Sequence, residues 1–142
     1  MTSRRQFMRT ACGTAAVAVC GGVSLSVTGC STVPLVTPEI KYGGLSVSVS
    51  VLAEEASVIL RRGLRPPIVI HKSEAGNYTA LLLQCSHKAC RPEVFEYSLD
   101  CPCHGSQFDF DGRVLNGPAE KALKTFPVTE DGEGNLFIAL EK

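Results

Sequence analysis

Apolar and polar residues alternate in the stretch that follows residue 44. From Leu45 to Val51 every second residue is leucine or valine, and serines stand between them. A period of two is typical of a strand with one buried face, because successive side chains point to opposite faces. Ala56–Leu60 is a second apolar run, which Arg61-Arg62-Gly63 ends. These runs predict strands, and no stretch has the period of a long amphipathic helix.

Turn-forming residues divide the later apolar runs into hairpins. Three pairs show this pattern: Ile68–His71 with Tyr78–Gln84 around Glu74–Asn77, Phe108–Phe110 with Arg113–Leu115 around Asp111-Gly112, and Phe126–Val128 with Leu136–Leu140 around Asp131–Asn135. Asp-Gly between apolar runs is a strong hairpin signal. Glu93–Leu99 alternates as one strand would. His71 has no partner residue nearby in sequence and is expected on the surface of a strand. Many short strands with close turns predict an all-β fold of antiparallel sheets, a sandwich or a small barrel.

Charge separates the front of the chain from the rest. The chain has 14 basic and 14 acidic residues, and Arg4, Arg5 and Arg9 are the only charged residues before residue 30. Without residues 1–29, 11 basic and 14 acidic residues remain. This mildly acidic balance gives no support for nucleic-acid binding. The basic group in 61–65 is interpreted as a solvated turn, with a docking patch for an acidic partner as the alternative.

Residues 1–29 have the features of a twin-arginine export signal. Ser3–Met8 contains the paired arginines, and Ala11–Val27 follows with 17 uncharged residues. Val27–Cys30 resembles the cleavage box of bacterial lipoproteins, in which the cysteine is acylated. We therefore predict a signal peptide at 1–29 and lipidation of Cys30. An uncleaved membrane helix is the alternative, but the run is short for spanning a bilayer and contains three glycines.

The segment 30–44 is expected to hold the lipidated cysteine and a flexible tether. Two prolines and two glycines occur in it, without a helical period. We expect the folded domain to span 45–142.

The cysteines point to a metal centre. Three of the seven lie in the first thirty residues, and the other four lie between residues 85 and 103. Cys85-x-His87 and Cys101-x-x-His104 each place one cysteine beside one histidine. A Rieske-type [2Fe–2S] cluster needs two thiolates on one iron and two imidazoles on the other. Two loops that each supply one of each kind would meet that need.

A tetrahedral zinc site could use the same four ligands. Structural zinc sites usually have like pairs of ligands, with two cysteines followed by two histidines. The pairs are mixed here, which favours the cluster. Cys90 and Cys103 remain beside the ligands, as free core thiols or as a bonded pair.

The stretch Cys85–Ser106 resembles the Rieske iron–sulfur family, in the subgroup with a loop-linking disulfide found in respiratory complexes. The resemblance covers about the last hundred residues. It implies an all-β cluster-binding domain in which Cys85 and Cys101 bind the inner iron. It implies that His87 and His104 bind the outer iron. It also implies a disulfide between Cys90 and Cys103.

Other residues match or depart from the family pattern. Ser106 matches a serine that donates to a bridging sulfide, and Pro118 lies in a stretch similar to the loop that covers the cluster. Phe108 stands where high-potential members have a tyrosine. Lys88 replaces the apolar residue with which quinol-oxidising members dock, and Ala89 replaces the usual glycine. The charge of Lys88 puts quinol oxidation in doubt, because an unpaired charge is costly to bury.

The resemblance and the export signal together imply an exported, membrane-tethered protein that carries one electron on a [2Fe–2S] cluster. The twin-arginine route exports proteins already folded around a cofactor, so two separate stretches agree. We expect a location on the outer, periplasmic face of the cytoplasmic membrane. Expected partners are redox proteins: a cytochrome b or c, or a subunit of a larger oxidoreductase. Catalysis by the chain alone is not expected.

Four alternative functions remain from the sequence. The first two are the quinol-oxidising subunit of a cytochrome bc-type complex and the small subunit of an arsenite-oxidase-like enzyme. The third is a ferredoxin that feeds an oxygenase, which the export signal and the extra cysteine pair oppose. The fourth is a structural zinc lipoprotein.

Overall fold

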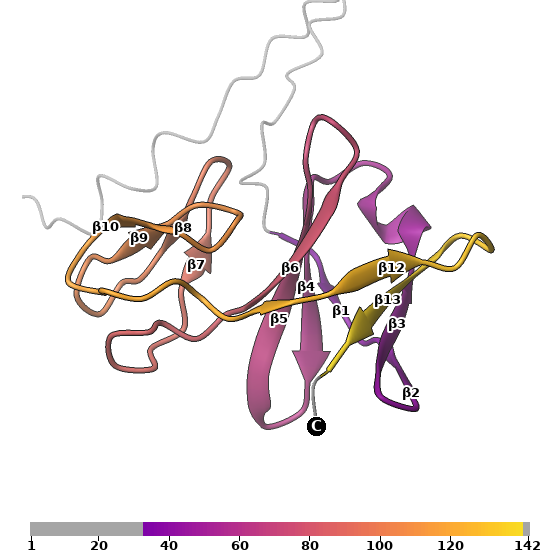
Figure 1. The fold of residues 1–142 in the computed structure, drawn as a ribbon, viewed down its shortest axis with the longest axis horizontal. Helices are drawn as coiled ribbons and strands as arrows, with labels where there is room; N and C mark the ends of the chain where they lie inside the picture. Colours follow the sequence, from indigo (N-terminus) through magenta and orange to yellow (C-terminus); the bar gives the residue numbers. More distant parts are fainter. Residues whose placement is uncertain (1–32, 141–142) are drawn as a thin grey trace, which may run out of the picture. The chain divides into compact units, whose positions relative to one another are not determined.

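The computed structural model describes residues 33–140, and in that range almost all regular structure is β (Figure 1). In chain order the strands are β1 (Leu35–Val36), β2 (Glu39–Lys41), β3 (Gly44–Ser48), β4 (Ser57–Arg62), β5 (Arg65–Lys72), β6 (Tyr78–Leu82), β7 (Glu93–Val94), β8 (Leu99–Asp100), β9 (Gln107–Phe108), β10 (Val114–Asn116), β11 (Thr125–Phe126), β12 (Val128–Glu130) and β13 (Asn135–Ala139). The only helical element in that range is a 3₁₀ turn, η2 (Val49–Leu52). The all-β prediction is confirmed. No helix between residues 33 and 140 is long and apolar enough to cross a membrane.

The strands form three sheets. The central sheet has the order β1-β4-β5-β6-β11, and the outer sheet has the order β12-β13-β3-β2. The small sheet, β10-β9-β8-β7, is built from the chain between β6 and β11. Figure 1 shows this excursion, in which the chain leaves the central sheet after β6 and returns to it as β11.

The central sheet is buried on both faces. One face packs against the outer sheet; its core residues include Val58, Leu60, Ile68, Ile70 and Ala80. The opposite face carries Ile59, Val69 and Leu81. They pack with Leu83, just after β6, and with Leu99 and Phe108 of the small sheet. Burial on both faces explains why β4 and β5 read as continuous apolar runs without alternation.

The three predicted hairpins are confirmed as the antiparallel pairs β5–β6, β9–β10 and β12–β13. The prediction of one strand over Glu93–Leu99 is wrong. The backbone turns there, because the N–H of Phe95 donates to the carbonyl of Ser98 at 2.8 Å and pairs β7 with β8. Phe95 and Tyr97 are exposed. Their alternation with polar residues therefore did not indicate a strand with one buried face.

The strand predicted over Leu45–Val51 ends early, at Ser48. The Ser48 hydroxyl accepts from the N–H of Ser50 at 3.3 Å and caps η2. Serine caps helical turns by this bond, so the period of two continues in the sequence after the strand has ended. Strands β1 and β2 lie within 30–44, where the sequence predicts a tether; β1 pairs with β4 and β2 pairs with β3.

His71 lies on strand β5, as expected, and its partners come from residues far away in the sequence. Its ring on β5 stacks on Phe110, with centroids 3.7 Å apart and planes 8° from parallel. Its Nδ1 lies 2.9 Å from the hydroxyl of Ser57 on β4. Burial lowers the pKa of His71, which favours the neutral ring. Because Phe110 lies in the β9–β10 turn, the stack joins the small sheet to the central sheet.

Candidate metal centre

The first loop of the site, residues 85–90, follows β6. The N–H of Cys85 donates to the carbonyl of Cys90 at 2.7 Å, and the N–H of Ala89 donates to the carbonyl of Cys85 at 2.8 Å. Ala89 has a φ of +56°, in the left-handed region. The two bonds close the loop, which carries His87 between them.

The second loop, residues 101–106, joins β8 to β9 and repeats this pattern. The N–H of Cys101 donates to the carbonyl of Ser106 at 2.7 Å, and the N–H of Gly105 donates to the carbonyl of Cys101 at 2.9 Å. Gly105, with a φ of +78°, is equivalent to Ala89 of the first loop. The two loops are therefore related by the same backbone hydrogen bonds, and each starts at a free cysteine.

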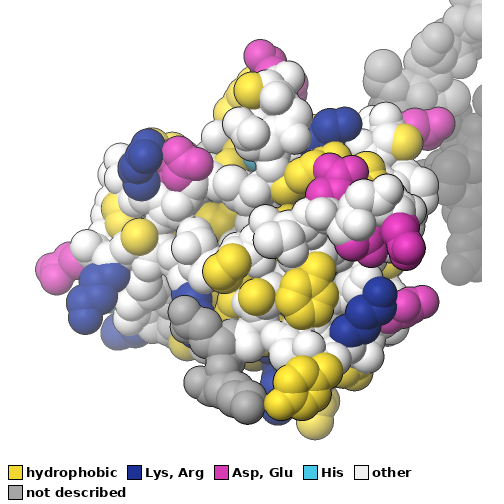
Figure 2. Space-filling view, turned by 45° about the vertical axis from the view of Figure 1, so that its right-hand side comes forward, with side chains coloured by type: hydrophobic (Ala, Val, Ile, Leu, Met, Phe, Trp, Pro, Cys, Tyr) yellow, Lys and Arg dark blue, Asp and Glu magenta, His cyan; other side chains and the backbone are white. Residues whose placement is uncertain are grey.

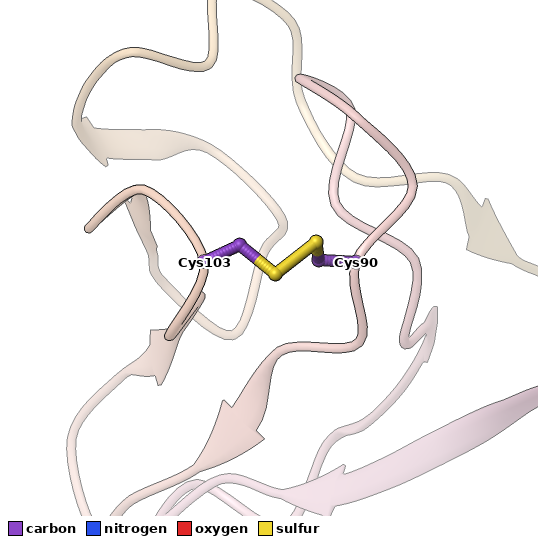
Figure 3. Close-up of a disulfide and its surroundings, with 2 residues drawn as sticks. All are labelled: Cys90 and Cys103. Carbon is purple, nitrogen blue, oxygen red and sulfur yellow. A yellow bond between two sulfur atoms is a disulfide. The ribbon is translucent and has the colours of Figure 1, made fainter.

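A disulfide joins the two loops. Cys90 and Cys103 are bonded, with their Cα atoms 6.5 Å apart, as the family resemblance implies (Figure 3). The bond runs directly from one loop to the other, so neither can move away alone. The sulfur of Cys101 also lies within 4.8 Å of both bonded sulfurs. These three sulfurs do not form a metal site, because metals bind thiolates and two of the sulfurs are already bonded.

The other two cysteines are free thiols inside the protein. Cys85 is 3% exposed and Cys101 is 2% exposed. Burial raises the pKa of the Cys101 thiol, and its hydrogen bond with Cys85 raises it further, whereas backbone hydrogen bonds from Cys103 and His104 oppose the rise. Thiolates in such a place need a metal cation to stabilise them.

The two predicted histidines meet in space. The rings of His87 and His104 lie edge to face, with centroids 4.8 Å apart. The Nδ1 atom of His87 is buried and has no hydrogen-bond partner in the part of the chain that the structure describes. A buried nitrogen without a partner costs free energy unless something binds it, and imidazole nitrogen is a common metal ligand. His104 is exposed.

Residues 117–121 form a third side of the site. The buried hydroxyl of Ser106 accepts from the N–H of Ala119 at 3.0 Å, so its own proton remains available for another acceptor. The hydroxyl of Ser86 donates to the carbonyl of Lys121 at 2.5 Å. Pro118 is exposed and follows a cis peptide bond. Sequence reasoning missed both serine contacts, because they join residues 13 and 35 positions apart.

Two departures from the family pattern have a clear place in the structure. Phe108 is completely buried and belongs to the same apolar cluster as Cys85 and Cys101. Lys88 is exposed on the first loop, next to His87. Thus the ring lies in the core beneath the site, and the lysine lies on its surface.

The described donors fit a binuclear iron cluster. Two buried thiols lie on two equivalent loops, and two imidazoles from those loops meet at a ring distance of 4.8 Å. The sequence profile of the Rieske [2Fe-2S] domain matches residues 39–127. The chain belongs to this family. It is therefore a Rieske electron-transfer protein, and its cofactor is a [2Fe–2S] cluster.

Relatives in sequence are named as iron–sulfur subunits of cytochrome complexes. The iron–sulfur subunit of the cytochrome b6-f complex from a Synechococcus strain is 37% identical over 102 residues, which is 66% of this chain and 59% of the relative. The Rieske subunit of the cytochrome bc1 complex from Corynebacterium glutamicum is 41% identical over 69 residues, which is 45% of this chain and 17% of the relative. The match thus spans less than two thirds of either relative.

Solved structures show the same fold. The plasma membrane Rieske protein PetC3 from Synechocystis PCC 6803 has a TM-score of 0.58 at 24% identity, covering 69% of this chain and 97% of that protein. A ferredoxin from Sphingomonas yanoikuyae B1 has a TM-score of 0.52 at 21% identity, covering 66% of this chain and 94% of that protein. The fold is therefore that of a Rieske domain.

Ala89→Gly should stabilise the protein. A left-handed residue other than glycine costs about 1–2 kcal/mol, and the greater freedom of glycine in the unfolded chain offsets part of the gain. We expect the free energy of unfolding to rise by about 0.5–1 kcal/mol, measured by denaturant unfolding of the holoprotein. Ala122→Gly, at an exposed alanine without a positive φ, is the control and should not stabilise. A loss of stability in Ala89→Gly would contradict the equivalence of the two loops.

Proposed function

We propose that Cys85 and Cys101 bind one iron of the cluster and that His87 and His104 bind the other. The observation that carries this assignment is the convergence of the two free buried thiols and the paired imidazoles on two equivalent loops. Cys90 and Cys103 are excluded as ligands because they are bonded to each other. The unpaired Nδ1 of His87 supports a metal bond at that atom.

The bound cluster supplies a one-electron redox centre. The surrounding residues adjust its potential. Backbone N–H groups of Cys103 and His104 donate toward the sulfur of Cys101, and the free hydroxyl proton of Ser106 can donate to the cluster. Such donors withdraw negative charge from a cluster and raise its reduction potential. Phe108, by contrast, offers no donor.

The electron is proposed to enter and leave on the histidine side. His104 is exposed there, whereas both thiols are buried, so a partner can approach the imidazole edges more closely than the sulfurs. Lys88 is exposed beside His87. A cation at this position favours a partner with an acidic docking surface. We propose transfer to a soluble acceptor, either a cytochrome c or a subunit of a larger oxidoreductase, from a membrane or periplasmic donor.

The second candidate is quinol oxidation within a cytochrome bc-type complex. The names of the sequence relatives favour it, since they are subunits of b6-f and bc1 complexes. Lys88 opposes it, because burying an unpaired ammonium group against an apolar docking surface is unfavourable.

The chain is proposed to be exported by the twin-arginine route and anchored by lipid on Cys30. Residues 1–32, which carry the signal and the anchor, lie outside the described residues. The support is the sequence pattern itself.

Replacing a proposed ligand should remove the cluster. Cys85→Ala or His104→Ala should abolish both the bound iron, two atoms per chain in the native protein, and the Rieske-type electron paramagnetic resonance spectrum of the reduced state. The double variant Cys90→Ala/Cys103→Ala is the matched control. It should keep the spectrum when freshly prepared and lose iron faster, because it lacks only the bond between the loops. Stoichiometric zinc in protein from iron-replete cells, or an intact cluster in Cys85→Ala, would refute the assignment.

Phe108→Tyr should raise the reduction potential. Phe108 shares an apolar cluster with Cys85 and Cys101, so we expect a new hydroxyl there to donate to a sulfur and withdraw negative charge from it. From a native potential of roughly 100–200 mV we expect a rise on the order of tens of millivolts, since 59 mV corresponds to a tenfold change for one electron. Protein-film voltammetry measures it. Phe137→Tyr on β13 is the control and should leave the potential unchanged. Equal shifts of the potential in both variants would contradict a specific effect of a hydroxyl at position 108.

Cys30→Ala should release the protein from the membrane. Mass spectrometry of protein extracted from membranes should find a chain that begins at an acylated Cys30. The variant should appear in the soluble or uncleaved fraction, because its acyl attachment site is gone. Intact residues 1–29 in the mature native protein would instead establish an uncleaved helix.

A further inference from the structure

Two neighbouring turns at one end of the sheets combine exposed apolar side chains with cations. We call them the two-turn surface: Ile40 and Tyr42 at the β2–β3 turn, Leu64 and Arg65 at the β4–β5 turn, and Arg61 and Arg62 just before it. Ile40, Tyr42 and Leu64 are the three most exposed large hydrophobic residues between residues 33 and 140, and Ile40 is 88% exposed. Large apolar side chains exposed together mark an interaction site more often than single ones do.

A cavity lies between the two turns. It has a volume of about 770 Å³, and Ile40, Leu45 and Leu140 contribute apolar walls. The three arginines also line it, whereas no aspartate or glutamate is among its lining residues in the described chain. Figure 2 shows hydrophobic side chains beside Lys and Arg side chains at the lower end of the view. The site is thus lined by both apolar and cationic side chains.

The arginines have no carboxylate partner in the part of the chain that the structure describes. The ion pairs found there join Arg113 to Asp109 and Asp111, in the small sheet. Arg62 donates to the carbonyl of Pro66 at 3.3 Å, which holds its guanidinium over the turn. Burial and the positive charge of Arg65 both lower the pKa of Arg62, so an anion at this place would relieve an unfavourable environment.

We propose that the two-turn surface binds the surface of a membrane that contains anionic phospholipid. Arginine binds phosphate in a two-pronged manner, and aliphatic and tyrosine side chains on turn tips partition into the boundary between headgroups and acyl chains. An acidic protein would match the arginines but would leave the projecting Leu64 and Ile40 without an apolar environment. The proposal does not depend on which residues bind the cluster.

The chain path places this surface within reach of a membrane-bound N terminus. β1 runs parallel to β4 toward the β4–β5 turn, and Thr37 and Pro38, directly after β1, line the cavity. Seven residues lie between Cys30 and Pro38, and the eight residue-to-residue steps from one to the other span at most about 28 Å. An anchor at Cys30 and the two-turn surface can therefore meet the same membrane.

A tryptophan placed at the turn reports insertion directly, because the native chain contains none. Full-length Leu64→Trp is mixed with phosphatidylcholine vesicles, with or without about one-third phosphatidylglycerol. With phosphatidylglycerol, we expect a blue shift of the emission and quenching by lipids brominated in their acyl chains. Leu115→Trp, at an exposed leucine of the small sheet, is the control and should show neither. Circular dichroism and thermal unfolding verify that both variants fold.

A second measurement compares vesicle binding by the native chain and by arginine variants, none of which carries an added tryptophan. Arg61→Gln/Arg65→Gln should weaken partitioning onto phosphatidylglycerol vesicles about fivefold per arginine, and added salt should reduce the difference. Arg113→Gln is the matched control and should bind as the native chain does. Arg4, Arg5 and Arg9 are present in every variant, so only the change on substitution is compared. No change in the double variant, or equal shifts on neutral vesicles in Leu64→Trp, would overturn the proposal. A change in the emission of Leu64→Trp with polyglutamate but not with vesicles would also overturn it, because that result indicates an acidic protein as the partner.

Discussion

Burial of the central sheet on both faces is the constraint on which the rest of the structure depends. Ile59, Val69 and Leu81 are cross-strand neighbours on one face, and they pack with the two free cysteines and Phe108. The opposite face packs against the outer sheet. The metal-binding loops therefore pack against one face of strands whose other face is also buried. A ligand set on this support keeps its geometry, because a close-packed interior resists small displacements.

Several independent contacts then hold the loops in place. The two backbone hydrogen bonds in each loop set its curvature, and the disulfide fixes one loop relative to the other. Ser86 and Ser106 tie the loops to residues 119–121, and the His71–Phe110 stack ties the small sheet to β5. Together these contacts place two thiols and two imidazoles close together. Preorganised donors suit an electron carrier, because the cluster environment then changes little between oxidation states.

Exposed cations lie on two sets of elements. Lys88 lies beside the histidines on the small-sheet side, and the three arginines of the two-turn surface lie at the ends of β4 and β5. In the proposals above, the first surface meets a redox partner and the second meets lipid.

The sequence by itself determined the features that short-range chemistry controls. The Cys-His pairs lie within three residues of each other, and the turns at Glu74–Asn77 and Asp111-Gly112 carry their own backbone signals, so the metal-binding loops and the main hairpins could be predicted. Only the tertiary structure decided what depends on distant pairing. It turned Glu93–Leu99 into a hairpin, stacked His71 on Phe110, and placed Ala89 in the left-handed position equivalent to that of Gly105. It also brought the β2–β3 and β4–β5 turns around one cavity. These features arise from contacts between residues far apart in the chain, which local patterns of polarity do not encode.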